Sequence, residues 1–187
     1  MTEVLAFADA AGWEAWLADH HSRPDGVWLR IAKKGSGLAS VTVAEALDVA
    51  LCYGWIDGQR KALDEHHYLQ KYTPRRPRST WSKVNVAKAE ALIAAGRMRA
   101  PGMAAIEAAK ADGRWAAAYG PARTATVPAD LAAALERDER ARRFYESLGR
   151  TDRYLVILRL EVARTPEARA ARLRRMVADL AAGRRVR

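Results

Sequence analysis

The segment from Lys71 to Lys83 concentrates the residues of this 187-residue chain that are best suited to bind an anion. Five of its thirteen residues are cations, none is acidic, and it leads into a helix predicted from about Trp81 to Gly96. Free amides of a helix's first turn, hydroxyl groups and arginine forks all favour a phosphate or carboxylate. Trp81 and Asn85, one helical turn apart, would add a stacking face and an amide. The alternative is a solvated basic loop that Trp81 anchors in the core.

Asp57 offers a second kind of chemistry because it lies within the sequence YGWIDG, residues 53–58. A carboxylate beside the large side chain of Trp55 is suited to general acid or base catalysis. Gly58, directly after it, lets a ligand approach the backbone closely. The alternative is an ion pair between Asp57 and an arginine of the following loop, which is the more frequent outcome for such a carboxylate.

These two segments define one candidate site. We predict an anionic small molecule as its ligand, and no cofactor. The catalytic residue would be Asp57, and the ligand-binding residues would be Tyr53, Trp55, Arg75, Arg76, Ser79, Trp81, Ser82 and Asn85.

The histidines and the single cysteine add neither a metal site nor a nucleophile. Side chains of adjacent residues diverge in helices and strands, and neither histidine pair, at 20–21 or at 66–67, has a ligand at metal-binding spacing. We therefore predict no metal. Cys52 ends a predicted helix, where the dipole disfavours a thiolate, and is expected to be buried. A lone cysteine also agrees with a reducing compartment.

The net charge of +10 is concentrated at the C-terminal end of the chain. Residues 150–187 contain eleven arginines and four acidic residues, and therefore carry +7 of that charge. A basic helix in this region could contact nucleic acid or an acidic surface. The alternative is a solvated basic face, favoured by the absence of aromatic residues between the cations. The residues concerned are Arg169, Arg172, Arg174 and Arg175.

Hydrophobic periodicity predicts the elements that carry these residues. Asp9 caps a first helix, which is followed by a strand at 27–32 with period-two alternation. Thr42 and Glu45 form a capping box for a second helix, and the strands 55–62 and 67–73 form a hairpin. Ser79 or Thr80 would cap the helix after the basic segment. Val84, Ala89, Leu92 and Ile93 would form its core face.

The remaining elements are all predicted to be helical. One helix begins at Pro101, a favoured first-turn residue. Proline and glycine then mark a linker at 119–127 between an α+β domain, 1–118, and a basic helical module, 128–187, with four helices. The predicted fold class is α+β, with a small antiparallel sheet of one strand and a hairpin packed with helices.

The N-terminal residues indicate a cytoplasmic protein that does not span a membrane. They include an acidic residue, lack a basic leader region and reach two tryptophans where a signal peptide would be cleaved. The apolar residues recur in short amphipathic blocks, which argues against a spanning helix.

With these segments in place, the chain resembles the YdeI/OmpD-associated family, also called bacteriocin-protection proteins. The resemblance runs over nearly the whole chain and is most specific in ALCYGWIDG, residues 50–58, and YTPRRPRSTWSKVN, residues 72–85. The tail resembles the family's C-terminal helical module, although Ala168 stands where the family pattern has threonine. The resemblance implies a role in tolerance of antimicrobial peptides or in the response to envelope stress. It implies no reaction and no catalytic residue.

Three functional hypotheses follow from the sequence. The leading one is a stress-tolerance protein that binds a phosphate- or carboxylate-bearing small molecule in the candidate site. The second is an enzyme acting on an anionic substrate, with Asp57 as general acid or base. The third is a nucleic-acid-binding protein that uses the basic tail and loop.

Overall fold

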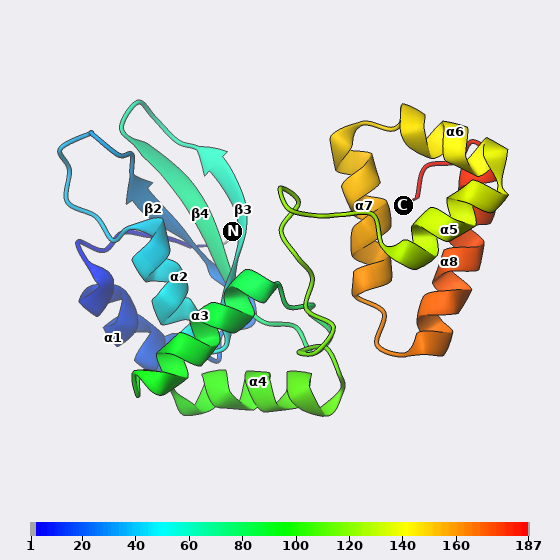
Figure 1. Ribbon diagram of the computed structural model, residues 1–187. Coiled ribbons are helices and arrows are strands. Elements are labelled where there is room, and N and C mark those ends of the chain that lie inside the picture. Colours follow the sequence, from blue (N-terminus) through cyan, green and yellow to red (C-terminus); the bar gives the residue numbers. More distant parts are fainter. Residues whose placement is uncertain (1–2, 187) are drawn as a thin grey trace. The chain divides into compact units, whose positions relative to one another are not determined.

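The computed structural model describes residues 3–186 (Figure 1). The described chain is of the predicted α+β class and forms two compact units. The first unit comprises the residues up to Ser79 together with Ala87–Ala109, and the second comprises Thr80–Val86 and the residues from Lys110 onward. The elements are β1 (Val4–Leu5), α1 (Ala10–His20), β2 (Val27–Ala32), α2 (Val43–Cys52), β3 (Trp55–Ala62), β4 (His67–Pro74), α3 (Lys83–Ala94), α4 (Ala100–Ala111), α5 (Ala129–Arg137), α6 (Glu139–Ser147), α7 (Arg150–Glu161) and α8 (Pro166–Ala181).

The sheet of the first unit has the strand order β1-β2-β4-β3. The predicted strand and hairpin are confirmed as β2, β3 and β4, which pair antiparallel, with a bulge in β3 between Asp57 and Arg60. The two-residue strand β1, which pairs parallel with β2, was not predicted, because two residues are too few to show a periodicity. The fold class is therefore as predicted, but the sheet is mixed and has one more strand.

An aromatic cluster joins α1 and α2 to one face of this sheet. Trp13 of α1 is fully buried, and its ring lies 6.2 Å from that of Trp55 on β3 and 5.8 Å from that of Tyr72 on β4. The indole N–H of Trp13 donates to the carbonyl of Ala46 in α2 at 3.1 Å. Burial raises the pKa of Tyr72, and the negative charge of Asp57 raises it further. This cluster is the centre of the first unit's core.

Helix α2 begins and ends as the sequence predicts. The side chain of Thr42 accepts from the amide of Glu45, and the carboxylate of Glu45 accepts from the amide of Thr42, so the capping box is confirmed. Gly54 follows the helix with φ of 73°, a left-handed conformation that glycine adopts without strain, and the chain then enters β3. This turn fixes where Trp55 and Asp57 lie.

Helix α4 approaches α2 closely at Gly102. A Cβ atom added to Gly102 would lie 2.3 Å from the carbonyl oxygen of Cys52, well inside van der Waals contact. The same carbonyl accepts a hydrogen bond from the amide of Arg99 at 3.1 Å, so it is held in place. Only glycine fits at this crossing.

The second unit is built on the four helices α5 to α8, which confirms the helices predicted beyond the linker (Figure 1). Thr165 caps α8 by accepting from the amide of Ala168, and Pro166 occupies the first turn. The buried core residues are Leu131, Leu135, Ala141, Tyr145, Leu148, Val156, Ile157, Leu160, Met176 and Leu180.

Helix α3 differs from its prediction at the N-terminal end. It begins at Lys83, and the hydroxyl of Ser82, in place of Ser79 or Thr80, accepts from the amide of Asn85 at 3.2 Å. The reason is tertiary: the backbone around Trp81 and Ser82 pairs with Tyr119, which holds it extended.

The predicted core face of α3 is correct in part. Ala89 and Leu92 are buried, but Val84 is 50% exposed, so its assignment to the core was wrong. The later start of the helix explains this error, since Val84 falls in the first turn, next to the extended segment.

We expect Gly102→Ala to lower the free energy of unfolding by at least about 2 kcal/mol, because overpacking against a fixed carbonyl costs more than the helix propensity that alanine adds. Gly58→Ala is the control, since its added Cβ would only meet Lys71 atoms at 3.8 Å. Urea titration of both variants measures the difference. Equal stability of the two would contradict the packing of α4 on α2.

Candidate functional site

The N-terminal half of the predicted site lies in the first unit. Trp55 is fully buried, and its indole N–H donates to the carbonyl of His21 at 2.7 Å. Tyr53 is 8% exposed and caps α2, whereas Asp57 is exposed on β3, opposite Tyr72. Trp55 is therefore a core residue, and of Tyr53, Trp55 and Asp57 it is Asp57 that is exposed to solvent.

The loop after β4 carries the arginines of the predicted site. The amide of Arg75 donates to the carbonyl of Gly54 at 2.9 Å, which ties the loop to the turn that follows α2. The amide of Arg76 donates to the hydroxyl of Ser79 at 3.1 Å, and the amide of Ser79 donates back to the carbonyl of Arg76 at 2.9 Å. The hydroxyl of Ser79 thus holds the turn, and the side chains of Arg76 and Arg78 are exposed.

The rest of the predicted site lies in the second unit. Trp81 is 2% exposed, with its ring 4.8 Å from that of Trp115, which is the core-anchor alternative raised from the sequence. Ser82 satisfies the amide of Asn85, one of the helix amides that an anion was expected to use. Because the two halves of the site belong to different units, their convergence on one ligand stays a prediction.

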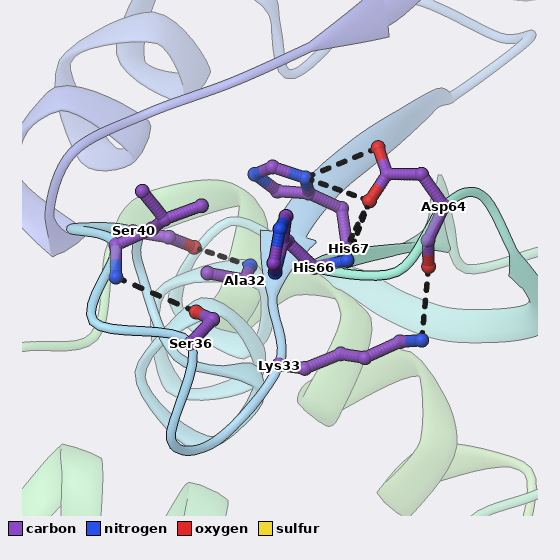
Figure 2. A network of polar contacts seen from close by, with 8 residues as sticks. Ala32, Lys33, Ser36, Ser40, Asp64, His66 and His67 are labelled. Atoms are coloured by element: carbon purple, nitrogen blue, oxygen red, sulfur yellow. Dashed lines mark hydrogen bonds and ion pairs between the residues drawn. The ribbon is translucent and has the colours of Figure 1, made fainter.

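At the turn between β3 and β4, the side chains of Asp64 and His67 form a pair, and Ser36 and Ser40 lie nearby (Figure 2). The carboxylate of Asp64 accepts from the amides of His66 and His67 at 2.8 and 2.7 Å, and lies 3.1 Å from Nδ1 of His67. Desolvation raises the pKa of Asp64, but the hydrogen bonds from His66 and His67 together lower it more, so this pKa lies below its usual range. The hydroxyl of Ser40 accepts from the amide of Ala32 and donates to a backbone carbonyl.

This network organises a turn and shows no arrangement for nucleophilic catalysis. Its serine hydroxyls contact backbone groups, and Lys33 donates to the carbonyl of Asp64 at 2.9 Å. Within residues 3–186, no group of three or more His, Cys, Asp or Glu side chains could hold a metal ion.

The arginines of α8 have different roles. Arg169 donates to both carboxylate oxygens of Asp130, at 2.7 and 2.9 Å, and to the carbonyl of Leu160 at 2.9 Å, so it links α8 to α5 and α7. Arg172 donates to the carbonyl of Arg159 on α7 at 2.9 Å. The prediction grouped these side chains with Arg174 and Arg175 as one binding surface, but Arg169 is engaged within the fold.

A groove between α7 and α8 is the feature that sequence reasoning missed. It has a volume of about 1140 Å³ and lies within the second unit. The signal was present in the sequence as apolar residues flanked by arginines on α8, but only helix packing shows that α7 supplies the other wall. The lining residues are Thr80, Leu155, Leu158, Arg159, Val162, Arg172, Arg175, Met176, Asp179, Arg184, Arg185 and Val186.

Two family models match the chain, one in each part. Residues 5–105 match a family described as a domain of unknown function, DUF8412. Residues 124–183 match the family described as bacteriocin-protection, YdeI or OmpD-associated. The first match covers more than half of the chain, so the chain belongs to the DUF8412 family, and its C-terminal part is similar to the YdeI/OmpD-associated family.

The YdeI/OmpD-associated module contains α5 to α8, and with them most of the residues that line the groove; Thr80, Arg184, Arg185 and Val186 lie outside the match. The predicted resemblance is thus confirmed for this module, while residues 50–58 and 72–85 lie in the DUF8412 segment. No curated protein and no solved structure matches the chain. Among residues 3–186, no helix is both long and apolar enough to cross a membrane.

The Arg169–Asp130 pair predicts a pH-dependent stability of the second unit. The hydrogen bond from Arg169 lowers the pKa of Asp130 on folding, so the stabilisation is complete above the ordinary carboxyl pKa of about 3.9 and is lost as the pH falls through the lower, folded value. We expect Arg169→Gln to cost about 1 kcal/mol at pH 7 and much less near pH 2, because both groups are partly exposed. Urea titrations at the two pH values, with Arg174→Gln as control, measure this; a pH-independent cost would contradict it.

Cys52 is expected to react slowly with thiol reagents. The side chain is 1% exposed, and burial raises the pKa of its thiol, so little thiolate forms at neutral pH. Labelling by an aromatic disulfide reagent should be about 100-fold slower in buffer than in urea, because it requires opening of the core. Rapid labelling of the folded protein would contradict this burial.

Proposed function

We propose that this bacteriocin-protection-type protein binds an amphiphilic anion in the groove between α7 and α8. The ligand would have an apolar chain and a phosphate or carboxylate head. The observation that carries the proposal is the composition of the groove, which combines apolar side chains with five arginines, three of which form no ion pair with a described carboxylate.

The charge of the groove favours an anionic head group. Of its arginines, Arg184 pairs with Asp179 at 2.7 Å and Arg185 lies 3.4 Å from Asp152. Arg159, Arg172 and Arg175 form no ion pair with a described carboxylate, and they come from both walls of the groove. Arginine forks bind phosphate and carboxylate oxygens in a bidentate manner, so these side chains complement such a head.

The apolar wall favours a chain attached to that head. Leu155 of α7 is 37% exposed although it is a large hydrophobic residue. Each methylene that a ligand buries there contributes about 0.8 kcal/mol, so a chain of several carbons adds more than the head group alone. Leu158 and Val162 extend this apolar surface along and just beyond α7, and Met176 of α8 and Val186 add to it from the other side of the groove.

The proposed ligand belongs to the class that the sequence indicates, but the proposed site is the groove between α7 and α8 in place of the site predicted from residues 53–85. The burial of Trp55 and Trp81 and the use of Ser82 as a helix cap support this change of site. For Asp57, no contact in the described part of the chain supports the enzyme hypothesis beyond its position opposite Tyr72.

Calorimetric titration of the full chain with dodecyl phosphate tests the proposal. We expect Arg175→Gln to weaken binding about tenfold, the loss of one charge-assisted contact, and Arg174→Gln to change it less than about twofold. The two residues are neighbours on α8, but only Arg175 lines the groove. Inorganic phosphate and an uncharged amphiphile of equal chain length should each bind more weakly.

Either of two results would contradict the proposal. One is an equal effect of the two substitutions, which would indicate general electrostatic attraction. The other is equal binding of the uncharged amphiphile, which would remove the arginines from recognition. Thermal unfolding of each variant checks that the module remains folded.

A further inference from the structure

The sheet of the first unit has a second face, opposite the one that carries the aromatic cluster. Side chains alternate along a strand, so Trp28 and Arg30 of β2 point away from the core-facing residues Val27, Leu29 and Ile31. The strand register places Lys71 and Leu69 of β4 beside Trp28 and Arg30, with Lys61 of β3 beside Leu69. We call these five residues, Trp28, Arg30, Lys61, Leu69 and Lys71, the outer sheet face.

None of the five residues of the outer sheet face is acidic, and the carboxylate of Asp64 lies at the hairpin end, 3.1 Å from Nδ1 of His67. Asp57, the acidic residue of the paired strands, is opposite Tyr72 and so belongs to the core-facing side. Arg30 and Lys61 are exposed and Lys71 is half-buried, so solvent reaches all three cations. Neighbouring strands lie about 4.8 Å apart, which spreads the positive charge over the width of three strands.

Trp28 lies at the centre of these cations. The ammonium nitrogen of Lys61 is 4.0 Å from its ring centroid and that of Lys71 is 5.8 Å away. Trp28 is only 7% exposed, and these flexible side chains cover its ring on the solvent side. If the ammonium groups moved to bind phosphates, the indole face would become available to a base.

We infer that the outer sheet face binds single-stranded nucleic acid. Cations that follow a phosphate backbone, together with an aromatic ring that can stack on a base, are the combination that single strands require. A duplex offers its phosphates but keeps its base faces stacked, so it could use the lysines and not Trp28. The inference is independent of the proposed ligand of the second unit, because none of these residues lines the groove.

Fluorescence anisotropy with labelled twelve-nucleotide oligo(dT) and oligo(U) tests this inference on the full chain. Affinity for single strands should fall with salt, and the logarithmic slope should become shallower by about 1.4 in the double variant Lys61→Gln, Lys71→Gln, because two phosphate contacts are lost. Lys110→Gln is the matched control. Lys110 also lies over a tryptophan, 5.4 Å from the ring centroid of Trp115, but outside the sheet.

Substitution of Trp28 separates stacking from charge. Trp28→Leu should weaken binding severalfold at every salt concentration and leave the slope unchanged, because stacking releases no counterions. Trp28→Phe should recover part of the affinity, since it restores an aromatic ring. Circular dichroism and thermal unfolding confirm that each variant is folded.

Four outcomes would overturn the inference. The first is no binding of either oligonucleotide at low salt. The second is a double lysine variant that behaves like Lys110→Gln. The third is tighter binding of a duplex of equal length. The fourth is binding of vesicles containing phosphatidylglycerol without binding of oligonucleotides, which would assign the face to a lipid surface.

Discussion

The packing of Trp13 against the sheet is the interaction on which the first unit depends. Its ring contacts Trp55 and Tyr72, and its N–H satisfies a carbonyl of α2, so one side chain fixes the position of two helices on two strands. An aromatic side chain of this size buries a large apolar area while its N–H still requires a partner. Because this contact fixes which side of the sheet becomes core, it also leaves Trp28 on the other side, among cations.

The distribution of arginine partners organises the second unit in a comparable way. Arg169 forms a bidentate ion pair with Asp130 and also donates to a backbone carbonyl near the end of α7. Its guanidinium is therefore not available to an external anion. Arg175, six residues farther along the same helix, forms no ion pair with a described carboxylate and lines the groove. A basic helix is therefore not one uniform surface. The pairing of each arginine, and not the total charge, separates structure from recognition.

Sequence patterns predicted the structure correctly where it depends on residues close together in the chain. The capping box at Thr42 and the alternation in β2 depend on neighbours in the chain, and the structure confirms both. Predictions from the sequence were wrong where a segment distant in the chain forms a contact. The start of α3 depends on pairing of Ser82 with Tyr119, and Val84 became exposed for that reason.

The sequence by itself determined the fold class, the helices of the YdeI/OmpD-associated module, the positions of the turns and the excess of positive charge, because these follow from periodicity, capping and composition. Tertiary structure alone decided which polar and aromatic residues are accessible. Trp55 and Trp81 had the right chemistry for a ligand but are buried, whereas Arg159 and Arg175, far apart in the chain, line one groove. Burial and pairing depend on contacts between distant segments, and a residue's type does not specify them.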